Sequence, residues 1–228
     1  MAAELQIIAG GGIAGSLDEL ARQFERASGH KLAIRYATVP DLIKLATSGE
    51  PFDAAVAPQE LFQNDAARTR MTASPTATIA RAGLGVAVPA GAGRPDISSE
   101  AAFKQALLAA RSLATIPSSA AGTQILKLFE RLGIAQELKP RLKALAGPKE
   151  LVQAMAAGEA ELGMFLINVL MAPGLDVVGP VPAALDQQIV YVGRLAAAAK
   201  EPAAGRAFID FLQTPQAKKV IVAKGMTA

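Results

Sequence analysis

Residues 5–29 of the chain read LQIIAGGGIAGSLDELARQFERASG, and this stretch decides the fold class. A short apolar run, 5–9, predicts a β-strand, and the glycines 10–12 follow as a tight turn. From Ile13 onward apolar residues recur at helical spacing, and Gly29 is typical of a helix C-terminus. Strand, glycine turn and helix in this order predict an α/β protein with largely parallel sheets.

The rest of the chain repeats this alternation of short strands and amphipathic helices. Strands are predicted at residues 31–36, 52–57, 83–88, 112–116, 161–166 and 188–195. A second turn of small residues, 117–122, again joins a strand to a helix, which we expect from Thr123. Two helices close the chain, and Thr214-Pro215 supply the N-cap and first turn of the last one.

The order of elements predicts two lobes that the chain enters and leaves twice. No long linker or low-complexity segment separates them, so they are not a simple tandem. Strands near residues 80–89 and 187–196 would join them as a two-strand hinge. We expect one lobe from 1–82 plus 192–228, a second from 83–191, and a ligand cleft between them.

The composition excludes several kinds of chemistry. The chain has 228 residues, no Cys and one His, which excludes disulfides, thiolate nucleophiles, iron–sulfur clusters and multi-histidine metal centres. A net charge of +3 with 4% aromatic residues argues against nucleic-acid binding. The most apolar stretch, 162–185, is broken by Pro, Gly, Asn and Asp, which argues against membrane insertion. We expect neither a metal nor a cofactor.

Four segments carry a resemblance to a known family. They are the glycine turn with its helix at 7–29, the segment from Tyr36-Ala37-Thr38 to Phe52-Asp53, the segment 155–163 and the terminal segment 207–226. In this order and spacing, the chain resembles the type II periplasmic solute-binding proteins, and among them the molybdate-binding protein family. The resemblance implies two α/β lobes, each a mostly parallel sheet flanked by helices, on a two-strand hinge that closes over a small solute.

The resemblance also implies a ligand site. In this family, backbone amides and hydroxyls at helix N-termini hold an oxyanion, and the helix dipole makes a basic side chain unnecessary. Ten residues of this chain fall at those positions or in the two turns described above. They are Gly11, Gly12, Ile13, Thr38, Val39, Ser118, Ser119, Gly122, Thr123 and Asn168. No catalytic residue is expected among them.

The same residues admit purely structural interpretations. The glycine run 10–12 could serve only a tight turn, and it lacks the G-x-G-x-x-G spacing of a dinucleotide site. Ser118 and Ser119 could simply cap the following helix, and the hydroxyl of Thr38 can cap a helix and bind a ligand at once. Asn168 lies in an apolar stretch, so its amide needs a partner, which is either backbone or ligand.

Departures from the family pattern bear on the identity of the ligand. Gly12 stands where the family has a serine, and the serine-rich second turn is reduced to Thr38-Val39-Pro40. The family tyrosine falls near Leu166, with Asn168 as the nearest polar residue. A molybdate site built from several hydroxyls and a tyrosine is therefore eroded. The sequence favours a different small anion, such as an organic carboxylate.

The leading hypothesis is a non-catalytic, monomeric solute-binding protein that delivers a small oxyanion or carboxylate to an ABC transporter permease. One alternative is an isomerase of unsaturated tricarboxylates such as aconitate, with Tyr36 and Asp41 as candidate bases. A cytoplasmic ligand sensor is another, because no signal-like segment precedes residue 5. The resemblance implies a periplasmic protein if a signal peptide was removed, and a native start at Met1 would make it cytoplasmic.

Overall fold

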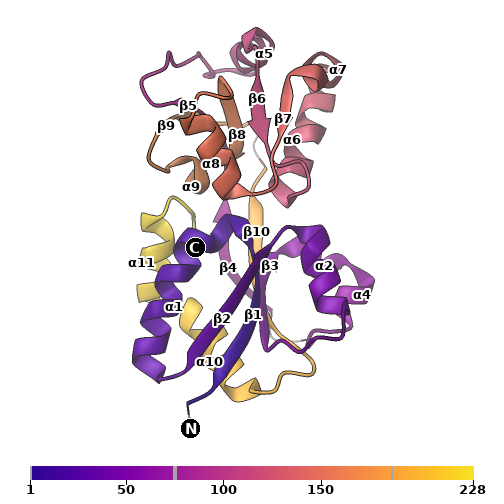
Figure 1. Ribbon diagram of the computed structural model, residues 1–228, viewed down its shortest axis with the longest axis vertical. Helices are drawn as coiled ribbons and strands as arrows, with labels where there is room; N and C mark the ends of the chain where they lie inside the picture. The colour runs from indigo at the N-terminus through magenta and orange to yellow at the C-terminus, as the bar shows by residue number, and fades with distance from the viewer. Residues whose placement is uncertain (1, 74–75, 186) are drawn as a thin grey trace. The chain divides into compact units, whose positions relative to one another are not determined.

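The computed structural model describes residues 2–73, 76–185 and 187–228, so Met1 lies outside the described residues. The chain forms two compact units, shown in Figure 1: unit 1 is Met1–Arg81 with Ile189–Ala228, and unit 2 is Ala82–Gln188. Ala82, which the sequence predicts in the first lobe, belongs to unit 2, and residues 189–191, predicted in the second lobe, belong to unit 1. The reason is that strand β10 begins at Ile189 and pairs with a strand of unit 1.

Unit 1 is built on a five-stranded sheet with the order β2-β1-β3-β10-β4. The strands are β1 (Glu4–Gly10), β2 (Lys31–Ala37), β3 (Ala54–Pro58), β4 (Ala77–Ala82) and β10 (Ile189–Leu195). β1 is parallel to both β2 and β3, whereas β10 is antiparallel to β3. The predicted strands at 31–36, 52–57 and 188–195 are thus present, within a few residues at their ends.

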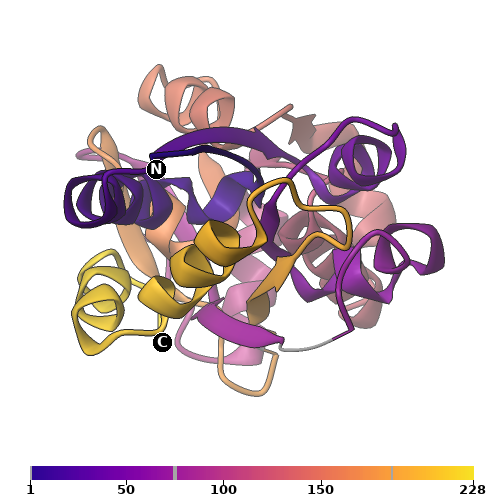
Figure 2. The same ribbon diagram turned by 90° about the horizontal axis from the view of Figure 1, so that it is seen from below.

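Helices cover both faces of this sheet. They are α1 (Ala14–Ser28), α2 (Val39–Thr47), α3 (Gln59–Gln63), α4 (Asp65–Arg68), α10 (Pro202–Leu212) and α11 (Pro215–Ala223). α1 contacts α10 and α11, whereas α2 contacts α3 and α4. Figures 1 and 2 show these two groups on opposite sides of the sheet. Gly29 ends α1 with a φ of 76°, as the sequence predicts, because a residue without Cβ adopts this conformation at no steric cost.

One hydrophobic core of unit 1 lies between β1, β3, β10 and the helices α2 to α4. Its fully buried members include Ile8, Leu42 and Leu61, which come from three different elements. On the other face, Phe24 of α1 packs edge-on against Phe208 of α10, with ring centroids 5.2 Å apart. The amphipathic faces that the sequence predicts for these helices therefore pack against the sheet and against one another.

Asp53 connects the start of β3 to two distant segments of unit 1. Its carboxylate is buried and accepts hydrogen bonds from the backbone N–H groups of Gln6, Lys200 and Glu201, at 2.8, 2.8 and 3.0 Å. Buried charge is stable only when it is satisfied in this way. Asp53 therefore fixes the approach to α10, and it belongs to the framework of unit 1.

Unit 2 is built on a second five-stranded sheet, with the order β7-β6-β8-β5-β9. The strands are β5 (Leu84–Pro89), β6 (Leu113–Thr115), β7 (Leu142–Ala144), β8 (Leu162–Leu166) and β9 (Leu175–Pro180). β6 is parallel to β7 and β8, but β5 is antiparallel to β8 and β9. The sheet is therefore mixed, where a mostly parallel one is expected from the sequence. β5 and β10 each follow a passage of the chain from one unit to the other, so no crossover helix sets their direction.

The helices of unit 2 are α5 (Glu100–Ala109), α6 (Ala120–Arg131), α7 (Ala135–Leu138), α8 (Pro148–Ala156) and α9 (Ile167–Leu170), with a 3-10 turn, η2, at Lys139–Arg141. α5 and α6 both contact α7, and α8 contacts α9 (Figure 1). Phe103, Phe129 and Phe165 fill the core and are almost fully buried. α6 starts at Ala120, three residues before the predicted start at Thr123. Residues 120–122, predicted as part of the turn, are therefore the first turn of α6, and only residues 117–119 form the turn before it.

Candidate functional site

In unit 1, the predicted site residues lie together at the edge where the parallel strands end. The last residue of β1, Gly10, pairs with Ala37, the last residue of β2. The chain continues from these two positions into Gly11–Ile13 and Thr38-Val39, so the two segments are neighbours. The carboxyl ends of parallel strands are where open α/β sheets bind ligands. Gly11, Gly12, Ile13, Thr38 and Val39 thus form one group.

The glycine turn forms a short 3-10 helix, η1 (Gly11–Ile13), that leads directly into α1. Gly12 and Ile13 are buried, and Ala14 N donates to Gly11 O. The N-cap residue of α1 is Ile13, which has no side-chain acceptor, and within the described part of the chain no side chain caps α1. Such a helix start presents backbone N–H groups and the positive end of the helix dipole.

Thr38 occupies the N-cap position of α2, as the sequence predicts, and Pro40 lies in the first turn. Its hydroxyl, which the sequence allows as a cap, does not cap the helix: Thr38 Oγ1 donates to Asp41 Oδ2 at 3.1 Å, and no side-chain cap bond forms at α2 among the described residues. The reason is that Asp41 offers a charged acceptor one turn away. The N–H of Val39 therefore begins a helix whose start has no side-chain acceptor.

Unit 2 repeats this arrangement at the end of its own parallel strands. β6 pairs in parallel with both β7 and β8, so the segments that follow the three strands start at one edge. α6 follows β6, α8 follows β7 and α9 follows β8. The predicted residues Ser118, Ser119, Gly122 and Thr123 lie in the first of these segments. Asn168 lies in the third, in α9, where it is partly buried.

Ser119 is the N-cap of α6, and its hydroxyl is fully engaged. Ser119 Oγ accepts from Gly122 N at 2.9 Å and donates to Ile116 O at 2.7 Å. Thr123 Oγ1 donates back to Ser119 O at 3.0 Å. Ser119 therefore caps α6, which is one of the two interpretations that the sequence leaves open, and the Thr123 hydroxyl bonds to the helix start as well. Ser118 is exposed at the same edge.

Gly122 lies inside the first turn of α6, where a larger residue has no room. A Cβ there would be 1.8 Å from Ile116 O and 2.8 Å from the Cα of Pro117. The helix start therefore packs directly against the strand end.

The structure adds two segments that the sequence did not single out as binding residues. Ala120 and Ala121 are buried in the first turn of α6, between the serines and Gly122. Gly147 is the N-cap of α8 at the end of β7, and no side-chain bond caps that helix in the described chain. Because β7 is only three residues long, its periodicity was too weak to predict. Gly-Pro at 147–148 was the available signal.

The two candidate bases of the isomerase alternative are both engaged. Burial raises the pKa of Tyr36, and its hydrogen bond to Asp18, at 2.5 Å, raises it further. Asp41 is exposed, and hydrogen bonds from Lys44 and Thr38 lower its pKa. A phenol with a raised pKa keeps its proton at neutral pH and cannot accept another, and a carboxylate with a lowered pKa is a weak base.

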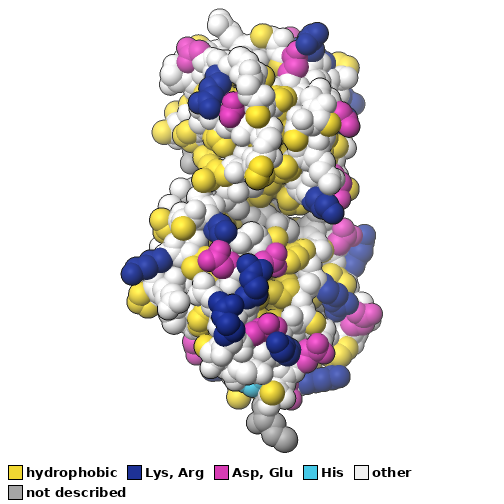
Figure 3. Space-filling model, turned by 60° about the vertical axis from the view of Figure 1, so that its left-hand side comes forward, with side chains coloured by type: hydrophobic (Ala, Val, Ile, Leu, Met, Phe, Trp, Pro, Cys, Tyr) yellow, Lys and Arg dark blue, Asp and Glu magenta, His cyan; other side chains and the backbone are white. Residues whose placement is uncertain are grey.

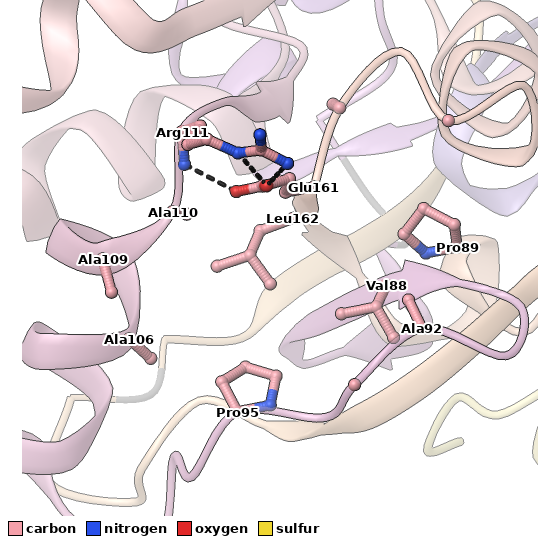
Figure 4. Close-up of a pocket in the computed structure, with 13 residues that line it drawn as sticks. Val88, Pro89, Ala92, Pro95, Ala106, Ala109, Ala110, Arg111, Glu161 and Leu162 are labelled. Atoms are coloured by element: carbon pink, nitrogen blue, oxygen red, sulfur yellow. Dashed lines mark hydrogen bonds and ion pairs between the residues drawn. The ribbon is translucent and has the colours of Figure 1, made fainter.

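A hollow of about 450 Å³ lies elsewhere in unit 2, beside β5, α5 and β8. Figure 4 shows its lining, with apolar residues such as Val88, Pro95 and Leu162 and the ion pair of Arg111 and Glu161. Arg111 N also donates to Glu161 Oε2 at 2.7 Å. None of the ten predicted site residues lines this hollow.

Among the described residues, neither the surface charge nor the arrangement of possible metal ligands marks a further site. On the face shown in Figure 3, acidic and basic side chains are interspersed. Among residues 2–73, 76–185 and 187–228, no group of three His, Cys, Asp or Glu side chains is arranged to hold a metal ion. In the same described ranges, no helix combines the length and the apolar character that crossing a membrane requires.

Comparison with known proteins identifies the family. The sequence matches the family described as "Bacterial extracellular solute-binding protein" over residues 5–227. It is 32% identical over 231 residues to an aconitate isomerase from a Pseudomonas species, covering 97% of this chain and 87% of that protein. It is 26% identical over 231 residues to the molybdate-binding protein ModA of Azotobacter vinelandii, covering 98% and 90%.

The fold agrees with solved structures of the same kind. The structure of a periplasmic molybdate-binding protein from Azotobacter vinelandii superposes with a TM-score of 0.79 at 20% identity, over 98% of this chain and 99% of that one. Neighbours of this kind are two-lobed periplasmic binding proteins, which confirms the predicted fold class. The family match extends over nearly the whole chain, from the first strand to the last helix. The chain therefore belongs to the bacterial extracellular solute-binding proteins, and its role is to bind a solute.

Proposed function

We propose that this chain captures a small anion and delivers it to the permease of an ABC transporter. The observation that carries the proposal is the set of helix starts at the strand ends. In unit 1 these are α1 and α2, and in unit 2 they are α6 and α8, each at least nine residues long. Helix N-termini bind anions through unpaired N–H groups and the helix dipole.

The proposed ligand site comprises the ten residues predicted from the sequence. Gly11, Gly12 and Ile13 with Val39 would contribute backbone amides from unit 1, and Gly122 would position the amides of Ala120 and Ala121 in unit 2. Thr38, Ser118 and Asn168 would orient the ligand, while Ser119 and Thr123 hold the helix start in place.

The proposed ligand is an organic carboxylate or an oxyanion other than molybdate. Support comes from the hydroxyls: those of Ser119 and Thr123 bond within α6, and that of Thr38 donates to Asp41. A tetrahedral oxyanion that relies on several hydroxyl donors finds few here. The names of the relatives, aconitate isomerase and molybdate-binding protein, both refer to small anions.

The family also supports a proposal for where the protein acts and in which oligomeric state. Its members are extracellular solute-binding proteins, and several structural neighbours are periplasmic. We infer a periplasmic location for this chain and action as a monomer that docks to a permease. Analytical ultracentrifugation of the purified protein, with and without ligand, measures its oligomeric state directly, and we expect a monomer.

Thermal-shift screening tests the proposed function. The panel contains molybdate, tungstate, sulfate, phosphate and a series of di- and tricarboxylates, and calorimetry follows up each positive result. A ligand at a hundred times its Kd adds about 2.7 kcal/mol of stability. For a chain of this size this raises Tm by about 5–10 °C. If no anion in the panel binds, the proposal fails.

The isomerase alternative is tested with the same material, because the relative named aconitate isomerase is 32% identical to this chain. Incubation with cis-aconitate or trans-aconitate, followed by chromatography, measures interconversion. We expect binding without turnover, since Tyr36 and Asp41 are both engaged in hydrogen bonds. Interconversion at a rate above that of the buffer would overturn this expectation.

A further inference from the structure

Glu60 contains a buried carboxyl oxygen with no hydrogen-bond partner among the described residues. Its Oε2 is shielded from solvent, although the side chain as a whole is only partly buried. None of the ion pairs of the described residues includes Glu60. Burying a carboxyl oxygen without a donor costs free energy, so this oxygen gains stability from any ligand that brings a donor to it.

Glu60 lies at the same strand edge as the glycine turn. It follows the end of β3 by two residues, in the first turn of α3. β3 pairs in parallel with β1, whose end leads into Gly11–Ile13. α3 also contacts β10, so Glu60 lies where β3 ends and β10 begins.

The end of β1 packs directly against the neighbours of Glu60. A Cβ on Gly10 would be 2.7 Å from Pro58 Cδ and 3.1 Å from Tyr191 Cε1. Tyr191 is almost fully buried, and burial raises the pKa of its phenol, with a further increase from the charge of nearby Glu60. Gly10, Pro58 and Tyr191 therefore pack together beside the glycine turn, and Glu60 follows Pro58 by two residues.

A carboxylate in this position changes which anions the unit favours. Backbone N–H groups donate to an anion, but a carboxylate can only accept. A fully deprotonated anion would leave Oε2 unpaired and would add a like charge nearby. An anion with a hydroxyl or an acidic proton can satisfy the amides with its oxygens and Glu60 with its donor. The cost of leaving Oε2 unpaired therefore disfavours anions without a donor relative to anions that carry one.

We propose that Glu60 selects, among small anions, those that carry a hydrogen-bond donor, as hydroxycarboxylates and hydrogen phosphate do. The inference rests on the proposed function, because it assigns specificity within the same site. A hydrogen bond to a charged group corresponds to about tenfold to a hundredfold in affinity. We expect a preference of this size for the donor-bearing member of a matched pair of anions.

Calorimetry at neutral pH with two matched pairs tests the inference. Malate, as both enantiomers, differs from succinate by one hydroxyl, and hydrogen phosphate differs from sulfate by its proton. The wild type, Glu60→Gln and the control Glu130→Gln are compared, because Glu130 is an exposed residue near the far end of α6. We expect the wild type and the control to prefer the donor-bearing anion. In Glu60→Gln this preference should fall at least about tenfold.

The outcomes separate a selective role from a structural one. Equal affinity for both members of each pair, or an unchanged preference in Glu60→Gln, overturns the inference and leaves the proposed function standing. A lower melting temperature of Glu60→Gln with an intact preference shows that Glu60 only supports the fold, and this also overturns it. If none of these anions binds the wild type, the inference fails for both ligand classes. Failure of the wider anion panel as well would then refute the proposed function.

Discussion

Units 1 and 2 start their helices at the same place in their sheets but finish the helix N-termini differently. In unit 2, the hydroxyl of Ser119 accepts from Gly122 N and caps α6. In unit 1, neither Ile13 nor Thr38 caps its helix with a side chain within the described residues. A capped helix start is rigid without a ligand, whereas an uncapped helix start gains the most stability from a bound anion. Gly147 leaves α8 of unit 2 without a side-chain cap in the described chain as well, so the comparison holds for α6. It predicts that α1 and α2 of unit 1 respond more strongly to ligand than α6 of unit 2.

The two glycines in the helix first turns give the largest expected contrast. Gly122→Ala in unit 2 places a methyl group against Ile116 O, and we expect a loss of about 3–5 kcal/mol because backbone must move. In unit 1, a Cβ on Gly15 meets nothing within 4 Å, so Gly15→Ala should be neutral or stabilise by up to about 1 kcal/mol. Hydrogen exchange of peptides from each unit measures both effects. Similar losses in the two variants would show that the two helix starts do not differ in this way.

Asp53 tests the hydrogen bonds that join the start of β3 to distant backbone in unit 1. Asp53→Ala removes three charge-assisted hydrogen bonds from buried backbone N–H groups and leaves those donors unpaired. We expect unit 1 to lose about 2–4 kcal/mol in urea unfolding, while exchange in unit 2 is unchanged. The control is Asp65→Ala, since Asp65 is exposed and pairs only with Arg68 on the surface. Equal destabilisation by both variants would contradict this role.

Alkaline pH should weaken unit 1 selectively, because both tyrosines of the chain, Tyr36 and Tyr191, lie there. Their pKa values are raised above 10.0, mainly by burial. A raised pKa means that the folded state holds the proton more tightly than the unfolded chain. This stability is complete below pH 10 and is lost as the pH rises above it.

The loss is up to about 1.4 kcal/mol per pH unit for each tyrosine. Phenolate absorbance and exchange in unit 1 measure it, and Tyr36→Phe should remove part of the pH dependence. Ionisation of both phenols near pH 10 in the folded protein would refute the prediction.

The smallest expected effects come from the two N-cap residues. Ser119→Ala removes the cap of α6 and should cost about 1 kcal/mol in unit 2. Thr38→Ala in unit 1 should cost only a few tenths of a kcal/mol, because within the described residues the Thr38 hydroxyl caps no amide and bonds to Asp41 alone. Chemical unfolding of each variant with and without bound ligand checks the pair. If Thr38→Ala lost more stability than Ser119→Ala in the absence of ligand, the comparison of the two helix starts would be contradicted.

The sequence by itself determined the α/β class, the order of most strands and helices, and the return of the chain to its first lobe. Apolar periodicity and turn residues carry this information locally, so 5–29 was enough to predict β1, the glycine turn and α1. The sequence also placed Thr38 and Ser119 next to helix starts. It left open whether each hydroxyl binds a ligand or caps a helix, since local spacing is the same in both cases.

Only the tertiary structure decided the direction of β5 and β10, the existence of the three-residue strand β7, and the use of each hydroxyl. Strand direction depends on long-range pairing, which leaves no mark in a run of apolar residues. Asp53 and Glu60 illustrate the same limit, because both are acidic residues close to β3. One accepts three backbone hydrogen bonds, and the other has a buried oxygen without a donor in the described chain. Segments distant in sequence set that difference, so no local pattern could reveal it.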